Sequence, residues 1–169
     1  MKKIIASVLL TGVLFADVYS DIAITVGHNE FDDPEFLKGH KEFYGIRAGF
    51  YPNENYGVQV GYEFANDANC QNLDLKRGYL NGVGQMKVSK NVSLYALATV
   101  GYESSNIHRF KPSQTFVGAG AGAKYHMSPN VNGFVESRIL KKLKSKDTDV
   151  ITSVGLAYQL DGLTTLGSD

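Results

Sequence analysis

The stretch NYGVQVGYEF, residues 55–64, alternates strictly between two kinds of side chain. In an extended chain successive side chains point to opposite faces, so a period of two predicts a β-strand. One face carries glycine, asparagine, glutamine and glutamate. The other face carries large apolar side chains, namely Tyr56, Val58, Val60, Tyr62 and Phe64. This aromatic-rich face must lie against either a protein core or lipid, and the rest of the sequence favours one of the two.

The same period recurs in seven more segments of about ten residues. They are residues 18–27, 42–51, 75–88, 92–102, 115–127, 131–140 and 150–160. Four connections are long, at residues 28–41, 65–74, 103–114 and 141–149, and three are short, at residues 52–54, 89–91 and 128–130. An even number of antiparallel strands, with long links at one end and tight turns at the other, is typical of an up-and-down membrane barrel.

The two faces of these segments differ in charge. The apolar face has no charged residue at the strand centres, and its tyrosines lie near strand ends, where membrane barrels carry aromatic girdles. The residues predicted to face lipid are Tyr44, Val58, Val60, Tyr62, Leu94, Val100, Tyr102, Val117, Tyr125, Val154, Leu156 and Tyr158.

The opposite face combines glycine with long polar side chains, as the lumen of a narrow barrel requires. Its predicted network consists of Arg47, Gln59, Glu63, Lys124, Glu136 and Arg138. A soluble sandwich or lipocalin would turn the faces the other way, but the tyrosine positions and the glycines favour lipid outside. We therefore predict an all-β fold, an eight-stranded antiparallel up-and-down transmembrane β-barrel.

The N-terminal residues differ from the rest. Lys2 and Lys3 precede an apolar run at residues 4–16, which ends on the small residue Ala16. This is the pattern of a signal peptide, and the run is shorter than the ~20 residues that a spanning helix requires. The predicted organisation is a signal peptide at residues 1–16, with cleavage as late as residue 20 as an alternative, a barrel at residues 17–160 and a short tail at residues 161–169.

Composition excludes several classes of partner. The formal net charge is zero, which argues against nucleic-acid binding. Cys70 is the single cysteine, so no intramolecular disulfide can form, and it leaves two roles open, a free thiol or a link between chains. The histidines show no metal spacing. We expect no metal and no cofactor.

Several segments resemble the OmpA-type outer-membrane barrel family. They are YGVQVGYEF, VSKNVSLYALATVGY, FVGAGAGAKYHMSPNVNGFVESR and the closing VGLAYQL. Residues 153–160 also resemble the C-terminal signal that the outer-membrane assembly machinery reads. The resemblance implies a bacterial outer-membrane location, periplasmic short turns and extracellular long loops. It also implies contact with outer-membrane lipid and lipopolysaccharide, and we expect a monomer.

Well-known members of that family carry a lumenal gate of two acids and two bases. By the quoted motifs these four positions fall on Gln59, Val83, Lys124 and Phe134, so the quartet is not kept. Charges in a confined lumen must be paired, and we expect this chain's own charges to plug the barrel. The expected role is structural support of the membrane, with surface loops available for adhesion or ligand contact. The alternative is a narrow channel for small solutes, gated by the lumenal charges.

Two further groups of residues could carry out chemistry or bind a ligand. His126, Ser128 and Glu136 resemble the His-x-Ser pattern of outer-membrane lipid A deacylases. However, the alternation places His126 on the lumenal face at the periplasmic end of its strand, away from lipid A. We therefore predict that the protein is not an enzyme. Lysines at four positions of a long connection form a predicted basic patch that is either solvated or binds phosphate groups, namely Lys141, Lys142, Lys144 and Lys146.

Overall fold

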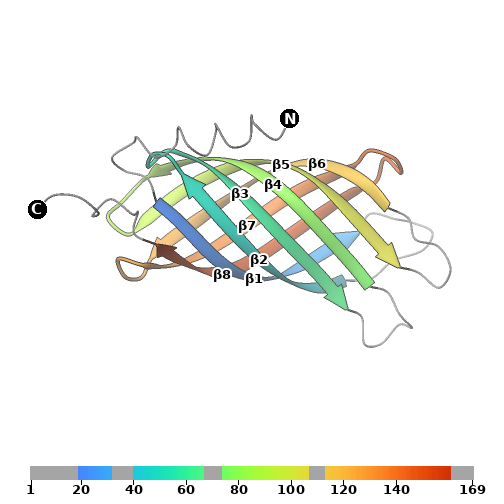
Figure 1. Cartoon of the computed structure of the whole chain (residues 1–169), viewed down its shortest axis with the longest axis horizontal. Coiled ribbons are helices and arrows are strands. Elements are labelled where there is room, and N and C mark those ends of the chain that lie inside the picture. Colours follow the sequence, from blue (N-terminus) through green and yellow to red (C-terminus); the bar gives the residue numbers. More distant parts are fainter. Residues whose placement is uncertain (1–18, 32–39, 67–73, 107–112, 161–169) are drawn as a thin grey trace, which may run out of the picture.

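The computed structural model describes residues 19–31, 40–66, 74–106 and 113–160. These residues form eight strands: β1 (Tyr19–Phe31), β2 (His40–Tyr51), β3 (Tyr56–Asn66), β4 (Asp74–Lys87), β5 (Val92–Asn106), β6 (Ser113–His126), β7 (Val131–Lys142) and β8 (Thr148–Leu160). Each strand pairs antiparallel with the next, and β8 pairs with β1, which closes the barrel (Figure 1). The predicted eight-stranded antiparallel barrel is confirmed.

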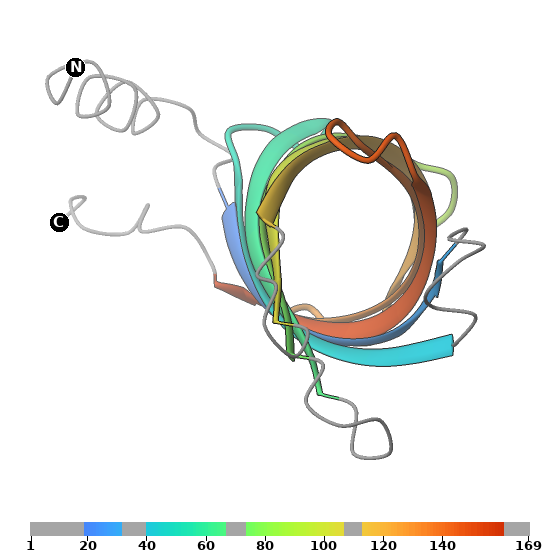
Figure 2. The ribbon, with the colours of Figure 1, turned by 90° about the vertical axis from the view of Figure 1, so that its right-hand side faces the viewer.

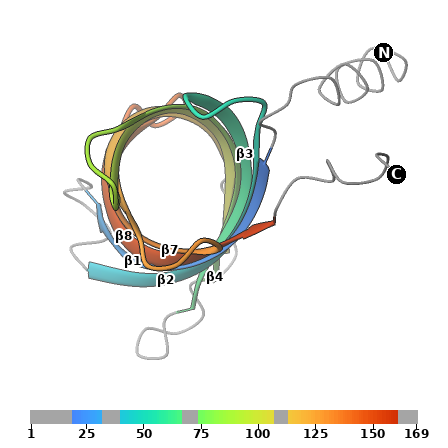
Figure 3. The same ribbon diagram turned by 90° about the vertical axis from the view of Figure 1, so that its left-hand side faces the viewer.

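The two ends of the barrel differ. The start of β1, the end of β8 and the short turns lie together at one end, which we call the turn end (Figure 1). The other end, which we call the long-loop end, carries the remaining connections. Seen along its axis from either end, the sheet forms a closed ring (Figure 2 and Figure 3). The predicted signal peptide, the predicted tail and Cys70 lie outside the described residues. Among the described residues no helix is long and apolar enough to cross a membrane.

Several strands extend further toward the long-loop end than predicted. β1 continues to Phe31, β5 to Asn106 and β7 to Lys142, while β8 begins at Thr148. The prediction ended each strand where apolar alternation stopped, but backbone pairing depends on neighbouring strands and not on apolar side chains. The β7–β8 connection is therefore short, residues 143–147, in place of the predicted long loop at 141–149.

The outer surface of the barrel is apolar. All twelve residues predicted to face lipid lie on it, each with 39–58% of its surface exposed. The lumen-facing residues of the same strands are buried, including most of the charged ones. The side-chain distribution is thus inverted relative to a soluble barrel, as a hydrocarbon environment requires.

The lumenal glycines have a steric explanation. Six buried aromatic rings lie against inward-facing glycines on an adjacent strand, where a Cβ would collide with the ring. Five of the six are direct cross-strand pairs. The pairs are Phe43 with Gly27, Tyr51 with Gly57, Tyr79 with Gly61, Tyr95 with Gly122, Phe116 with Gly101, and Phe134 with Gly155. The absence of a side chain at these inward-facing glycines therefore provides the space that the aromatic rings occupy in the lumen.

Candidate functional site

Among the residues that the structure describes, ten charged side chains lie in the lumen, each at most 9% exposed. Cations and anions are equal in number among them, so the set is neutral when all are ionised. A buried charge is tolerated only when it is paired and hydrogen-bonded, which makes neutrality a requirement of this arrangement. The cations are Arg47, Arg77, Lys124, Arg138 and Lys142, and the anions are Asp21, Glu63, Glu103, Glu136 and Asp149.

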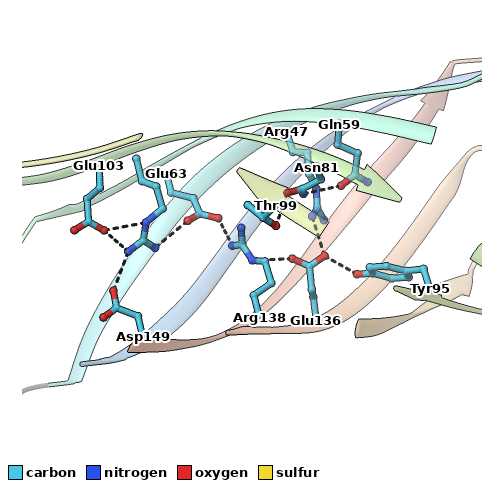
Figure 4. A network of polar contacts seen from close by, with 11 residues as sticks. Arg47, Gln59, Glu63, Asn81, Tyr95, Thr99, Glu103, Glu136, Arg138 and Asp149 are labelled. Carbon is cyan, nitrogen blue, oxygen red and sulfur yellow. Dashed lines mark hydrogen bonds and ion pairs between the residues drawn. The ribbon is translucent and has the colours of Figure 1, made fainter. Parts of the chain in front are cut away.

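One continuous chain of ion pairs runs through the central lumen (Figure 4). Arg47 Nη1 lies 2.9 Å from Glu136 Oε2, and Glu136 Oε1 lies 3.1 Å from Arg138 Nε. Arg138 Nη2 donates to Glu63 Oε1, while Glu63 Oε2 lies 3.3 Å from Arg77 Nη1. Positive and negative groups alternate along the chain, so each interior member has opposite charges on both sides.

Toward the long-loop end the chain widens into a four-membered cluster. Arg77 Nη2 lies 2.6 Å from Glu103 Oε2 and 3.4 Å from Asp149 Oδ2. Lys142 Nζ lies 3.4 Å from Glu103 Oε1 and 3.1 Å from Asp149 Oδ2. Two cations and two carboxylates thus bridge β4, β5, β7 and β8 where the lumen meets the loops.

Each of four lumenal cations also lies over an aromatic ring. The distance from the guanidinium carbon to the ring centroid is 4.4 Å for Arg47 over Phe134, 5.5 Å for Arg77 over Phe116 and 4.8 Å for Arg138 over Tyr79. Lys124 Nζ lies 5.1 Å from the centroid of Tyr51. The ring quadrupole attracts a cation, and the attraction grows when water is excluded. The rings that rest on glycine therefore also stabilise the charges.

At the turn end the charges form a separate pair. Lys124 Nζ lies 3.6 Å from Asp21 Oδ2. Beside them a cavity of about 10 Å³ is lined by the four positions that correspond to the family gate, Gln59, Val83, Lys124 and Phe134. That volume holds a single water molecule. At the positions of the four gate charges of the OmpA-type family, this chain has a small cavity and a single charged residue, Lys124. The counterion of Lys124 is Asp21 of β1.

Neutral polar side chains complete the packing between these charged groups. The Gln59 amide donates to the Tyr51 hydroxyl at 2.6 Å, and the Asn81 amide donates to Gln59 Oε1 at 3.1 Å. The Thr99 hydroxyl in turn donates to Asn81 Oδ1 at 2.8 Å. These bonds link β2, β3, β4 and β5 on the lumenal side without any ion pair.

Removal of the Asp21 carboxylate is expected to destabilise the barrel. Asp21→Asn would leave Lys124 buried without its counterion, at a cost of about 2 kcal/mol in the free energy of unfolding, modest because the 3.6 Å distance exceeds a hydrogen bond. Lys124→Met in the same chain should recover part of the loss, with a coupling energy of roughly 1 kcal/mol. Urea unfolding of the four proteins of this double-mutant cycle measures the coupling, and strictly additive effects would contradict the pair.

The structure distributes the six predicted network residues over three arrangements. Arg47, Glu63, Glu136 and Arg138 belong to the continuous chain, Lys124 pairs with Asp21, and Gln59 makes only neutral hydrogen bonds. The prediction missed half of the charged lumenal set, namely Asp21, Arg77, Glu103, Lys142 and Asp149. The two-residue alternation was a usable signal, because each of the five alternates with outward-facing side chains on its own strand.

The predicted basic patch is partly wrong. Lys142 is not a surface-loop residue: it ends β7, is 9% exposed and bonds Glu103 and Asp149 in the lumen. Lys141 also lies in β7 but faces outward, and Lys144 and Lys146 lie exposed in the β7–β8 connection. The error arose because the predicted strand ends at residue 140, where the outer face of β7 changes from apolar to charged.

The deacylase-like residues do not form a catalytic pair. The ring nitrogens of His126 lie 2.9 Å from Ser93 Oγ and 2.6 Å from Asn132 Oδ1, so both are engaged. Ser128 Oγ accepts a hydrogen bond from the Val131 amide at 3.1 Å within its turn. Ser128 therefore has no base in this arrangement. Among the described residues no group of three or more His, Cys, Asp or Glu side chains could hold a metal ion.

Comparison with known families agrees with this geometry. The outer membrane protein beta-barrel domain family matches residues 10–159. The chain belongs to this family. It is therefore a bacterial outer-membrane protein, which confirms the predicted location and the predicted OmpA-like character.

Solved outer-membrane barrels share the fold at low sequence identity. The N-terminal barrel domain of Pseudomonas aeruginosa OprF is 14% identical with a TM-score of 0.65, over 83% of this chain and 97% of that one. Ail, the attachment invasion locus protein of Yersinia pestis, is 16% identical with a TM-score of 0.64, over 85% and 99%. Neisserial surface protein A is 14% identical with a TM-score of 0.65, over 83% and 96%. No curated protein matches the chain.

Proposed function

We propose that this protein is a sealed structural barrel of the outer membrane, whose lumen does not conduct. The observation that supports this most directly is the neutral set of ten buried charges in the described part of the chain, beside which a lumenal cavity measures only about 10 Å³. Several of the ion pairs tie together strands that lie apart around the ring, as Arg138 of β7 does with Glu63 of β3 and Arg47 of β2 does with Glu136 of β7. Such cross-links stiffen a cylinder that must hold its shape under lateral pressure from lipid.

The orientation is part of the proposal and is inferred by analogy with the outer-membrane barrel family. We infer that the turn end faces the periplasm and the long-loop end faces the outside, with the apolar outer surface in direct contact with outer-membrane lipid. The connections at the long-loop end would then carry any adhesion or ligand contact. The name of the structural neighbour Ail, an attachment invasion locus protein, is consistent with that use of such a barrel.

Conductance in planar lipid bilayers tests the sealed lumen. The unmodified protein is expected to give no discrete current steps, whereas Arg138→Ala, which removes the link between Glu136 and Glu63, should give brief steps. Lys141→Ala, on the outer face of the same strand, is the matched control and should stay silent. Regular steps from the unmodified protein would contradict the proposal and support the gated channel.

The assembly state and enzymatic activity need separate measurements. We infer a monomer that is inserted by the outer-membrane assembly machinery and has no catalytic activity of its own. Heat-modifiable migration on a gel reports the folded barrel, and crosslinking in vesicles reports the monomer. Deacylation of lipid A that disappears in Ser128→Ala would overturn the non-enzymatic assignment.

A further inference from the structure

The register of the strands determines how far they tilt. Cross-strand partners followed once around the barrel, starting from His40 on β2, lead back to the same strand at Phe50, ten residues further along. In an eight-stranded barrel this displacement corresponds to strands tilted by about 40° from the barrel axis. Each step from β2 to β1, β8 and β7 therefore lies about 3 Å nearer the turn end, and successive outward-facing residues of one strand differ in height by about 5 Å.

Opposite charges lie at one height on the two sides of β8. Glu30 of β1, Val150 of β8 and Ile139 of β7 are successive partners, and Lys141 lies one outward position nearer the long-loop end than Ile139. With the steps above, Lys141 lies within about 1 Å of the height of Glu30, and Glu42 of β2 within about 2 Å. All three charged residues are exposed on the outer face. Within the described part of the chain none of the three forms an ion pair.

The positions of these charges around the circumference are self-complementary. Measured from Val150, Lys141 lies about 8 Å to one side, and Glu30 and Glu42 lie about 4 Å and about 12 Å to the other side. Two copies inserted into one membrane have the same orientation, so a two-fold axis between them must run parallel to the barrel axes. When this axis passes next to Val150, Lys141 of each copy comes to lie between the two carboxylates of the other copy.

The outer surface beneath Val150 allows two barrels to approach each other. By the same steps, Ser137 of β7 lies directly below Val150, about 8 Å nearer the turn end, and each Ser137 therefore meets its own copy on the axis. Its hydroxyl has no hydrogen-bond partner within the described part of the chain. In hydrocarbon such a hydroxyl gains free energy from a partner across an interface. Ala121, the partner of Ser137 on β6, adds only a methyl group to this surface.

We propose that two copies of this chain associate side by side in the membrane through β1, β7 and β8, with Lys141 of each copy between Glu30 and Glu42 of the other. A second copy satisfies charges of both signs at once, whereas an anionic lipid headgroup would satisfy only the lysine. Association follows insertion and obeys mass action, so at low protein-to-lipid ratios the chain stays the monomer inferred above. The proposal rests on the outer-membrane location and is independent of whether the lumen conducts.

Two charge-reversed proteins test the pairing. Lys141→Glu places an acid between two acids, and Glu30→Lys with Glu42→Lys places two bases around a base. Each variant alone is expected to associate about tenfold more weakly than the unmodified protein, the effect of losing two partly exposed ion contacts. When the two variants are mixed in the same vesicles, opposite charges meet again at both contacts. The mixture should therefore associate about as strongly as the unmodified protein.

Energy transfer between labelled chains measures this association. Cys70 is the single cysteine, and it takes a donor or an acceptor dye in urea before the protein is refolded into phosphatidylcholine vesicles. Transfer is recorded over a series of protein-to-lipid ratios. Lys76→Glu is the matched control, because Lys76 is an exposed lysine near the long-loop end of β4, four strands away from β8. Its reversal should leave the transfer unchanged, and heat-modifiable migration verifies that each variant folds.

Disulfide crosslinking locates the axis independently of charge. In a Cys70→Ser background, Ser137→Cys should give a covalent dimer on oxidation, because the axis brings the two substituted side chains together. Val60→Cys is the matched control. Val60 faces outward on β3, on the far side of the barrel and within about 2 Å of the height of Ser137, so this variant should stay monomeric.

Three results would overturn the proposal. One is energy transfer from the unmodified protein that does not exceed the value for randomly placed chains at the same density. Another is a mixture of the two charge-reversed variants that associates as weakly as each variant alone, because Lys141 would then serve another partner, such as a lipid phosphate. The third is equal crosslinking of Ser137→Cys and Val60→Cys, which would indicate random collision in place of a defined contact.

Discussion

Glu63→Gln is expected to lower the free energy of unfolding by roughly 3–5 kcal/mol, the range for a buried charge deprived of its partner. The carboxylate of Glu63 bonds the guanidinium groups of both Arg77 and Arg138 and is 2% exposed. A glutamine of the same shape would leave the lumenal set with one uncompensated positive charge. Urea unfolding in lipid vesicles, monitored by tyrosine fluorescence, measures the loss.

Two further variants show whether charge is responsible. Glu30→Gln makes the same chemical change on the exposed surface of β1 and should alter stability by no more than about 0.5 kcal/mol. Glu63→Gln combined with Arg77→Met restores neutrality and should recover a measurable part of the loss. A loss below about 1 kcal/mol for Glu63→Gln alone would mean that the network contributes little beyond filling space.

Gly122→Ala is expected to cost roughly 3 kcal/mol of unfolding free energy, although it adds a single methyl group. A Cβ at Gly122 would collide with the Tyr95 ring and with the carbonyl oxygen of Val135, so both the ring and a paired strand would have to shift. The displaced ring would also lose the hydrogen bond that its hydroxyl donates to Glu136 Oε2 at 2.9 Å. Steric and electrostatic losses therefore act together.

Gly82→Ala is the matched control for this prediction. Gly82 lies on the outer face of β4, and a Cβ there would meet no atom within 4 Å. Alanine should leave stability unchanged or raise it by about 0.5–1 kcal/mol, because glycine in a strand costs conformational entropy. Urea unfolding of both variants under identical conditions compares them. Equal losses would refute the view that lumenal glycines are required by the rings lying on them.

The two-residue alternation of the sequence predicted some of the charged lumenal residues but not all of them. Arg47 and Glu136 were predicted to face the lumen because each alternates with apolar residues on its own strand. Lys142 and Glu103 were not predicted to face the lumen, because they lie where the outer face of the strand is no longer apolar. The two-residue alternation nevertheless places both on the lumenal face. If the inward–outward alternation of each strand is continued past its last apolar residue, both side chains fall in the lumen.

The amino-acid order alone determined which side chains point outward and which point inward, because that depends only on the two-residue period of an extended chain. The number of strands and the contrast between turns and longer connections followed from the same period. Only the closed barrel decided which lumenal charges meet. Glu63 and Arg138 are 75 residues apart in the chain, and they pair because ring closure and strand tilt bring β3 opposite β7 at the same height. Local alternation has no information about that height, so the ion pairs became visible only in the tertiary structure.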